Sequence, residues 1–258
     1  MSSFWKGKTV FITGASSGIG AEMARQVSAM GATVGLLARR FEELEKLRNE
    51  IESLGGKARV FAVDVTNYES CVQAVESFVT EFGKIDILVA NAGIAGKVVN
   101  AWEIEPKNFE QVIRVNLLGA VNIVRAVLPY MLERNEGQLV AISSLAGFRG
   151  LPKSASYCAS KSAMNAFFES VRVDLFSSRI SVSIIQPGFI RTPLTAGRRS
   201  KMPFLMELEP ATRKIVKAIE KRKKFYAFPF PLATLVRLAR FFPASLYDRM
   251  VSKRSYRQ

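Results

Sequence analysis

Short apolar runs alternate with amphipathic segments along most of this chain, and this alternation constrains the fold more than any other feature. The runs lie at Thr9–Thr13, Thr33–Ala38, Ala58–Val63, Ile85–Ala90, Gln138–Ser143 and Ser181–Gln186. Strands joined by helical segments of this length run parallel, and a parallel sheet is covered by helices on both faces. The sequence therefore predicts an α/β fold with a doubly wound parallel sheet.

The segments between these strands show the three- or four-residue spacing of apolar side chains that is typical of helices. Tyr68–Phe82, for example, places Val72, Val75 and Val79 on one face. The other predicted helices are the segment with Ile19, Met23 and Val27, and Phe41–Leu54, Asn108–Leu132 and Ser154–Phe176. We expect the longest of them to end near Pro129. Because 258 residues suit one large domain, we assign 1–195 to its sheet-forming part and 196–258 to an extension of the same domain.

A glycine-rich turn joins the first predicted strand to the first helix. In that position, backbone N–H groups and the positive end of a helix dipole bind the pyrophosphate of a dinucleotide. Gly14 permits the tight turn, Gly18 lets the phosphates approach the backbone, and Gly20 lets helix and strand pack closely. The residues predicted to contact the cofactor here are Gly14, Ser16, Ser17, Gly18, Ile19 and Gly20. Turns of any function contain glycine, so the prediction depends on the strand–turn–helix context.

The end of the second predicted strand indicates which dinucleotide is bound. Sites for NAD place an acidic residue there to hold the 2′-hydroxyl of the ribose. Here Arg39 and Arg40 follow Ala38. A carboxylate would repel a 2′-phosphate, whereas the guanidinium of Arg39 can bind one. The alternative is that the two arginines, or Arg40 alone, only begin a solvated helix. We favour NADP(H) as the cofactor.

Tyr157 and Lys161 stand four residues apart in a predicted helix, so their side chains share one face. A phenol has a pKa of about 10, and a nearby ammonium lowers that pKa because it favours the phenolate. Such a tyrosine could protonate a carbonyl oxygen as a hydride arrives, or deprotonate an alcohol. The pair alone is common in helices for structural reasons. Ser144, however, follows the preceding strand at its carboxyl end, where open α/β sheets bind ligands, and could hydrogen-bond the same oxygen.

Together, these motifs resemble those of the short-chain dehydrogenase/reductase family in order and spacing, over about residues 7–195. The matching positions are Gly14, Gly18, Ile19, Gly20, Asn91, Ala92, Gly93, Asn116, Ser144, Tyr157, Lys161, Pro187 and Gly188. One departure is Ala90, where the family usually has a second Asn before Asn91. The resemblance implies a Rossmann-type fold and an NADP(H)-dependent oxidoreductase that interconverts a carbonyl and an alcohol. The alternative is a non-catalytic nucleotide-binding or regulatory protein, but such relatives typically lack the Tyr or the Lys.

The same resemblance implies a role for each site residue. Ser144 would orient the carbonyl, and Tyr157 would act as the acid and base. Lys161 would hold the nicotinamide ribose and tune Tyr157, while Asn116 would hold a water that relays protons through Lys161. Further cofactor contacts would come from Asp64 and Val65 beside the adenine, from Asn91, Ala92 and Gly93 along the cleft, and from Pro187, Gly188 and Thr192 at the nicotinamide end. Taken alone, Asn91 could be a turn residue, and Asn116 a helix residue making local hydrogen bonds.

Pro193–Glu209 occupies the position of the family's substrate lid. It mixes apolar and basic residues, namely Leu194, Met202, Phe204, Leu205, Met206, Arg198, Arg199 and Lys201. The apolar side chains suggest a hydrophobic substrate, lipid-like or steroid-like, although they could equally pack on the core.

The carboxyl-terminal tail is strongly basic. Residues 197–258 hold 16 Lys and Arg against 4 Asp and Glu, and so carry 12 of the 15 net positive charges. A predicted helix at Pro210–Lys224 ends in the basic cluster Lys221–Lys224, and aromatic residues and an amphipathic segment, Leu232–Phe242, follow it. This combination is typical of peripheral contact with an anionic membrane. The alternatives are an oligomer interface or a helix docked on its own core. With no recognition module evident, we expect no nucleic-acid partner.

Composition excludes several kinds of active site. The chain has no histidine, so histidine metal sites, Ser-His-Asp triads and Cys-His pairs are absent, and we predict no metal. Two cysteines, no evident signal peptide and no apolar run of about 18 residues predict a cytoplasmic protein, with or without peripheral membrane contact. The predicted partners are a small hydrophobic carbonyl or alcohol and further copies of the chain in a homodimer or homotetramer.

Overall fold

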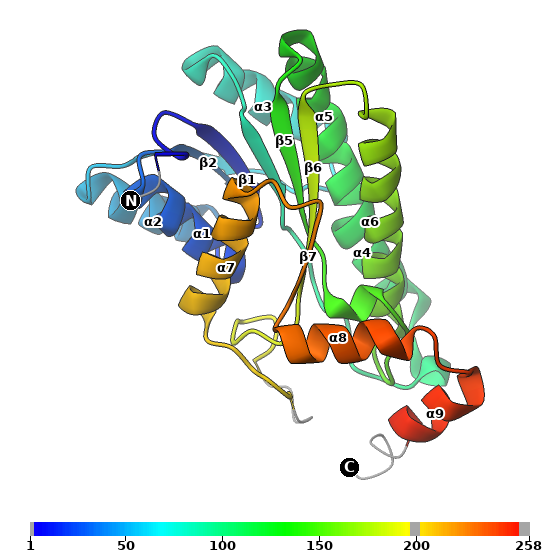
Figure 1. Cartoon of the computed structure of the whole chain (residues 1–258). Helices are drawn as coiled ribbons and strands as arrows, with labels where there is room; N and C mark the ends of the chain where they lie inside the picture. Colours follow the sequence, from blue (N-terminus) through cyan, green and yellow to red (C-terminus); the bar gives the residue numbers. More distant parts are fainter. Residues whose placement is uncertain (1–2, 197–201, 253–258) are drawn as a thin grey trace.

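The computed structural model describes residues 3–196 and 202–252 and has the predicted doubly wound architecture (Figure 1). Within these residues, seven parallel strands form one sheet in the order β3-β2-β1-β4-β5-β6-β7. The strands are β1 (Thr9–Thr13), β2 (Thr33–Ala38), β3 (Lys57–Ala62), β4 (Ile87–Ala90), β5 (Gly137–Ile142), β6 (Ile180–Pro187) and β7 (Phe225–Phe228). The strand order reverses between β1 and β4, the switch point at which such sheets bind ligands. The predicted fold class is confirmed.

Helices cover both faces of the sheet (Figure 1). One face is covered by α1 (Gly18–Ala29), α2 (Phe41–Ser53) and α7 (Leu208–Glu220). The other face is covered by α3 (Tyr68–Phe82), α4 (Pro106–Ile113), α5 (Gly119–Arg134) and α6 (Ala155–Asp174). The predicted boundaries of the strands and helices before α7 differ from these by a few residues at most, apart from the helix that contains Pro129.

The alternation of side chains along each strand fills the two cores. In β1, Val10 and Ile12 belong to the core beneath α1 and α7, whereas Phe11 belongs to the core on the opposite face. Phe11 packs there on Phe61 and Phe78, with ring centroids 5.4 and 5.2 Å apart. Successive side chains of a strand point to opposite faces, so this fully apolar strand is buried on both. Its burial fixes the position of the glycine turn that follows it.

The predicted helix Asn108–Leu132 differs from the structure. It is α4, a π-helical turn (Arg114–Leu118) and α5, and Pro129 lies inside α5 instead of ending it. Pro129 cannot donate to the carbonyl of Arg125, but Arg125 is exposed, so water can hydrate that carbonyl while the packing of α5 on the sheet maintains the helix. In the described part of the chain, Pro106–Arg134 is the one helical stretch long and apolar enough to cross a membrane, and its apolar face packs in the core.

The carboxyl-terminal region contains elements that were not predicted from the sequence. α7 ends at Glu220, before the basic cluster, and the chain reverses at Arg222, which has a φ of 45°. β7 then pairs with β6, so the aromatic residues after the cluster belong to a strand. α8 (Phe230–Ala239) begins before the predicted Leu232 and crosses the carboxyl end of the sheet, and α9 (Ala244–Ser252) lies beyond it (Figure 1).

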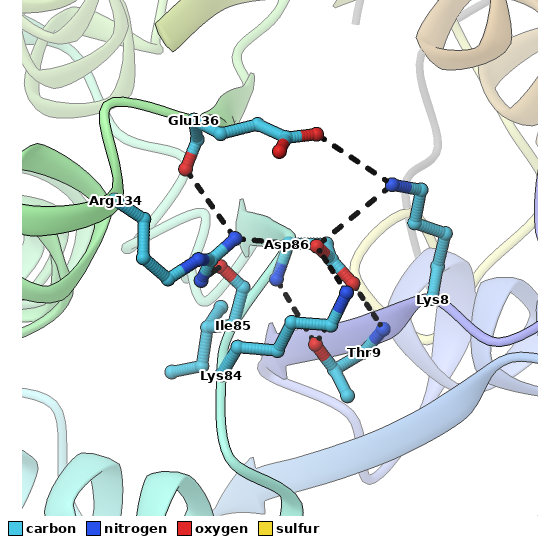
Figure 2. A network of polar contacts seen from close by, with 7 residues as sticks. All are labelled: Lys8, Thr9, Lys84, Ile85, Asp86, Arg134 and Glu136. Carbon is cyan, nitrogen blue, oxygen red and sulfur yellow. Dashed lines mark hydrogen bonds and ion pairs between the residues drawn. The ribbon is translucent and has the colours of Figure 1, made fainter.

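A polar network fills the opposite, amino end of the sheet (Figure 2). Its centre is Asp86, just before β4, which is 5% exposed. The Asp86 carboxylate accepts hydrogen bonds from the backbone N and Oγ1 of Thr9, at 3.0 and 3.2 Å. Lys84 Nζ, Arg134 Nη2 and Lys8 Nζ lie 3.2, 3.3 and 3.8 Å from its Oδ1. The network joins β1, β4 and the end of α5.

Candidate active site

The predicted site residues converge at the carboxyl ends of β1, β4, β5 and β6. Gly93 after β4, Asn116 in the π-helical turn and Lys161 in α6 approach most closely. A Cβ built on Gly93 would lie 3.2 Å from Asn116 Oδ1 and 3.7 Å from Lys161 Nζ. The backbone at Gly93 and the side chains of Asn116 and Lys161 therefore meet at one point, which the sequence predicted only through the resemblance.

Lys161 and Tyr157 are positioned by the docking of α6 on the end of β5. Lys161 Nζ donates to the carbonyl of Ile142 at 2.9 Å, and Ser143 Oγ donates to the carbonyl of Lys161 at 3.4 Å. One of these hydrogen bonds is donated by the helix and the other by the residue after the strand. Together they fix the position of α6 along the end of β5 and its rotation about its own axis. Lys161 Nζ lies 5.9 Å from the centre of the Tyr157 ring. The shared helical face predicted from the four-residue spacing is confirmed.

Lys161 is a buried base, only 4% exposed. Burial lowers the pKa of its ammonium from 10.5 to about 8. No ion pair among the described residues includes Lys161, whose ammonium lies near the carbonyl of Ile142, the thioether of Met164 and the ring of Tyr157. A lysine with a pKa close to neutral can exchange a proton at physiological pH, as an acid–base site requires.

Ser144 caps the short 3-10 helix Leu145–Gly147, which directly follows the end of β5. Its Oγ accepts a hydrogen bond from the N–H of Ala146 at 3.1 Å and lies 3.5 Å from the carbonyl oxygen of Pro187. Ser144 is therefore fixed between the ends of β5 and β6. Its hydroxyl lies on the ligand-binding edge of the sheet, as predicted.

Asn116 is fully buried in the π-helical turn between α4 and α5. Its amide accepts from the N–H of Ile94 at 2.8 Å and donates to the carbonyl of Ile94 and to Ser160 Oγ, both at 2.9 Å. Ser160 Oγ in turn donates to the carbonyl of Tyr157 at 2.8 Å. These partners are far away in the sequence, so the interpretation of Asn116 as a residue making local bonds was wrong. π-Helical turns occur often at functional sites.

The glycine turn is held by the segment after β4. Asn91 Nδ2 donates to the carbonyls of Thr13 and Gly14, at 2.9 and 3.3 Å. Thr13 Oγ1 accepts from the N–H groups of Asn91 and Ala92, both at 3.0 Å. A Cβ on Gly20 would meet the Gly14 oxygen at 2.5 Å, so the predicted close packing at Gly20 is real. Asn91 is thus more than a turn residue, and Thr13, which the sequence indicated only as the end of a strand, also holds the turn.

This turn fits a dinucleotide phosphate. Gly14 and Gly18 have φ angles of 67° and 56°, in the left-handed region that glycine adopts easily. Ser17 begins α1 without a side-chain hydrogen bond to the helix, so the first N–H groups are not capped from within. A side chain at Gly18 would fill the space beside Thr192, 3.6 Å away, whereas Ile19 packs into the core.

Arg39, Arg40 and Asp64 surround the predicted adenosine end. Arg40 begins α2 at an exposed position, as the alternative held, but its guanidinium also donates to the hydroxyls of Ser16 and Ser17, at 2.9 and 2.7 Å, and so lies over the glycine turn. Arg39 Nη1 lies 3.7 Å from Asp64 Oδ2. A cavity of about 280 Å³ next to them is lined by Arg39, Asp64, Thr66, Lys107, Glu110, Gln111, Arg114 and Val115. The nearby Val65 is buried and packs on Gly119.

At the other end of the site, the turn that follows β6, ahead of the predicted lid, meets α8. Gly188 N donates to the carbonyl of Phe228 at 2.7 Å, and a Cβ on Gly188 would lie 3.1 Å from Leu232. In the lid, Phe204 is 54% exposed, whereas Met206 is partly buried and packs on the core. Packing on the core is therefore confirmed for Met206, whereas contact of Phe204 with a substrate stays a prediction. The predicted basic residues Arg198, Arg199 and Lys201 lie outside the described residues.

Comparisons with known proteins agree with this geometry. The sequence pattern of the short chain dehydrogenase family matches residues 8–203. An uncharacterized oxidoreductase of Myxococcus xanthus is 39% identical over 93% of this chain and 95% of its own length. A fatty acyl-CoA reductase of Acinetobacter baylyi is 36% identical over 85% of this chain and 75% of its own. A crystal structure of a metagenomic short-chain oxidoreductase in complex with NADP has a TM-score of 0.74 and 29% identity, covering 87% of this chain and 96% of that one. The chain belongs to the short-chain dehydrogenase/reductase family of oxidoreductases.

Proposed function

We propose that this protein is an NADP(H)-dependent oxidoreductase that interconverts a carbonyl and an alcohol on a hydrophobic substrate. The observation that carries the proposal is the buried Lys161 beside Tyr157, fixed to the strand end that also carries Ser144. A purely structural lysine would not be left buried without an anionic partner.

In the direction of reduction, the bound reduced cofactor would supply a hydride to the carbonyl carbon. Tyr157 gives its hydroxyl proton to the carbonyl oxygen, and Ser144 donates a hydrogen bond to the same oxygen to orient it. Lys161 stabilises the resulting phenolate and, with a pKa of about 8, can return a proton to it. Asn116 holds the water that resupplies Lys161. In oxidation of an alcohol, each proton moves the opposite way.

The cofactor proposal depends on the cations at the end of β2. Arg39 and Arg40 would bind the 2′-phosphate of NADP(H), the glycine turn would hold the pyrophosphate, and Thr192 would contact the nicotinamide end. Asp64 and Val65 would flank the adenine, Asn91, Ala92 and Gly93 would line the cleft, and Pro187 and Gly188 would contact the nicotinamide end. The related structure in complex with NADP supports this assignment.

The substrate proposal rests on the apolar surroundings of Ser144. Leu145, Leu232 and Ala233 form a small buried cluster beside it, with Phe148 and Phe189 packed against them. A relative whose name is fatty acyl-CoA reductase supports a lipid-like carbonyl. We also propose a cytoplasmic protein, active as a homodimer or homotetramer, that makes peripheral contact with a membrane through its tail.

A substrate screen tests the function. Long-chain aldehydes, long-chain acyl-CoA thioesters and steroid ketones, each with a short-chain equivalent, would be mixed with NADPH or NADH while the absorbance of the reduced cofactor is followed. We expect turnover of at least one long-chain or steroid compound with NADPH. NADPH binding without turnover of any compound would favour a non-catalytic nucleotide-binding protein instead.

A further inference from the structure

The outer surface of α8 and α9 exposes apolar side chains to an unusual degree. Phe230 and Phe241 are 79% and 83% exposed. The set, here termed the α8–α9 face, consists of Phe230, Leu235, Leu238, Phe241, Leu246 and Met250. Scattered exposed apolar residues are ordinary, but a gathered patch marks a surface that binds a partner or a membrane. None of the residues of α9 is buried, so the described parts of the chain, residues 3–196 and 202–252, leave this helix uncovered.

The inner side of α8 is a wall of the catalytic site. Leu232 and Ala233 are buried against Leu145, the residue after Ser144. Leu232 also lies against Gly188, the residue directly after β6. One helix therefore separates the residues beside Ser144 from the exposed α8–α9 face, as its position across the carboxyl end of the sheet suggests (Figure 1).

A second attachment ties α8 and α9 to the loop between Ser144 and Tyr157. Arg149 in this loop donates hydrogen bonds to the carbonyls of Ala239 and Phe242, at the end of α8. Its guanidinium also stacks on the ring of Tyr247 in α9, 3.8 Å from the ring centre, and the Tyr247 hydroxyl donates to the carbonyl of Gly150. The loop thus holds both helices, and any movement of the helices acts on the loop.

The charges of the two helices identify the surface that would cover them. Arg237, Arg240 and Arg249 are exposed on α8 and α9, whose single acidic residue is Asp248. A two-fold contact between copies through this face would bring the same arginines together and repel. Anionic lipid headgroups would attract them instead. α8 is about 15 Å long, half of the roughly 30 Å of a bilayer's hydrocarbon core, so it would lie on a membrane and not cross it.

We propose that the α8–α9 face docks on an anionic lipid bilayer and thereby holds the mouth of the catalytic site against the lipid. Docking itself follows from the surface alone, whereas its benefit for turnover rests on the proposed function. The basic cluster Lys221–Lys224 is not part of this surface. It precedes β7 whereas α8 follows it, so the two lie at opposite ends of that strand. The sequence-based prediction had joined them into one membrane-binding tail.

Co-sedimentation of the full chain with vesicles tests the docking. We expect binding to phosphatidylglycerol vesicles that weakens with salt, and weaker binding to phosphatidylcholine vesicles. The variant Phe230→Ser/Phe241→Ser should bind at least tenfold more weakly. Phe176→Ser is the matched control, because Phe176 is 86% exposed but follows α6, away from this face. Lys223→Gln/Lys224→Gln should bind nearly as the native chain does.

Two outcomes of these measurements would overturn the docking proposal. One is equal sedimentation of the native chain and the Phe230/Phe241 variant. The other is loss of binding in the Lys223/Lys224 variant alone, which would assign the contact to the basic cluster. If the Phe230/Phe241 variant instead loses self-association, measured by ultracentrifugation without lipid, the face binds a second copy and the proposal fails.

Kinetics test the orientation separately. With a long-chain carbonyl dispersed in phosphatidylglycerol vesicles, we expect a KM at least threefold lower than with the same carbonyl in detergent, and no such gain for a water-soluble carbonyl. Arg149→Met should still sediment with vesicles but lose this gain. An unchanged gain in Arg149→Met would overturn the role of the attachment. Vesicle binding without turnover would overturn the proposed function and leave the docking intact.

Discussion

Asp86 and Lys161 are ionisable groups buried to the same extent at opposite ends of one sheet, with exposures of 5% and 4%. At the amino end, the Asp86 carboxylate accepts hydrogen bonds from Thr9 and is surrounded by Lys84, Arg134 and Lys8 (Figure 2). At the carboxyl end, the ammonium of Lys161 contacts one backbone carbonyl and a thioether. The Asp86 carboxylate is thus surrounded by cations, whereas the Lys161 ammonium has no anion beside it among the described residues.

The pKa values follow this difference. Burial alone would raise the pKa of Asp86, but the backbone hydrogen bond from Thr9 and the ammoniums of Lys84 and Lys8 outweigh it, so that pKa lies below its ordinary value. Burial of Lys161 has no opposing contribution and lowers its pKa to about 8. The buried carboxylate at the amino end of the sheet therefore stabilises the fold, whereas the buried ammonium at the carboxyl end destabilises it. That destabilised ammonium lies where the proposed acid–base reaction would use it.

The largest expected effect is on turnover. Tyr157→Phe removes the proton that the carbonyl oxygen needs, so kcat should fall about 10³-fold, equivalent to roughly 4 kcal/mol. NADPH binding, followed by fluorescence titration, and the unfolding midpoint should change little. Tyr130→Phe, on α5, is the matched control and should keep full activity. A Tyr157→Phe enzyme with near-native kcat would remove Tyr157 from the mechanism.

Asp86→Ala should have the opposite pattern. It leaves the cations of the amino end without their shared anion, and loss of one partner from a buried charge network costs about 3–5 kcal/mol. Urea unfolding should show this loss at neutral pH, while kcat stays within about twofold. Since the folded pKa of Asp86 is below the unfolded one, its contribution is present above about pH 4 and is lost as the pH falls through the folded pKa. The two proteins should therefore converge in stability in acid. A strongly reduced kcat in the folded variant would contradict the separation of the two ends.

Lys161→Met should stabilise the protein while abolishing turnover. The folded pKa of about 8, against 10.5 for a free lysine, means that the buried charge destabilises the native protein by about 3 kcal/mol at neutral pH. Loss of the hydrogen bond to the Ile142 carbonyl destabilises the variant by about 1–2 kcal/mol. A net gain of about 1–2 kcal/mol is expected. Because the folded pKa is lowered, this cost is fully present below pH 8 and disappears as the pH rises towards 10.5. The advantage of the variant should fade over that range, measured by unfolding at pH 7 and pH 10. A variant less stable than the native chain at pH 7 would show that Lys161 is structural.

The site residues that were predictable from sequence are those whose surroundings are local. The glycine turn shows in the sequence because Gly14 and Gly18 adopt its left-handed φ angles easily, and the shared face of Tyr157 and Lys161 is fixed by helix geometry. Asn116 was placed at the site only through the resemblance, since its partners are Ile94 and Ser160, far away in the sequence. The π-helical turn that carries it shifts hydrogen bonds by one residue and has no signature in composition.

The carboxyl-terminal region shows the same limit in the fold. From the sequence, Phe225–Phe228 is an aromatic segment beside a basic cluster. It forms strand β7 because it pairs with the edge of β6, a contact that the segment itself does not indicate. Arg40 does begin the exposed start of α2, but only the fold shows that its guanidinium also reaches the hydroxyls of Ser16 and Ser17. The Asp86 network joins residues from three separate elements, so no single segment of sequence indicates it.

The smallest expected effect is on the choice of cofactor, which depends on Arg39 at the end of β2. Its charge is exposed to solvent, unlike the buried charges of Asp86 and Lys161. Arg39 is 62% exposed and already lies 3.7 Å from Asp64, so solvent and that carboxylate reduce its attraction for a 2′-phosphate. We therefore expect a preference for NADPH over NADH of about tenfold in kcat/KM, which corresponds to roughly 1.4 kcal/mol. Arg39→Asp should reverse the order, because a carboxylate repels the 2′-phosphate and can accept a hydrogen bond from the 2′-hydroxyl of NADH. Arg59→Asp, on β3 and also exposed, is the control and should keep the native preference. Equal kcat/KM for both cofactors in the native enzyme would contradict the assignment of NADP(H). A preference for NADPH that survives Arg39→Asp would instead assign the discrimination to Arg40, which the Ser16 and Ser17 hydroxyls hold over the glycine turn.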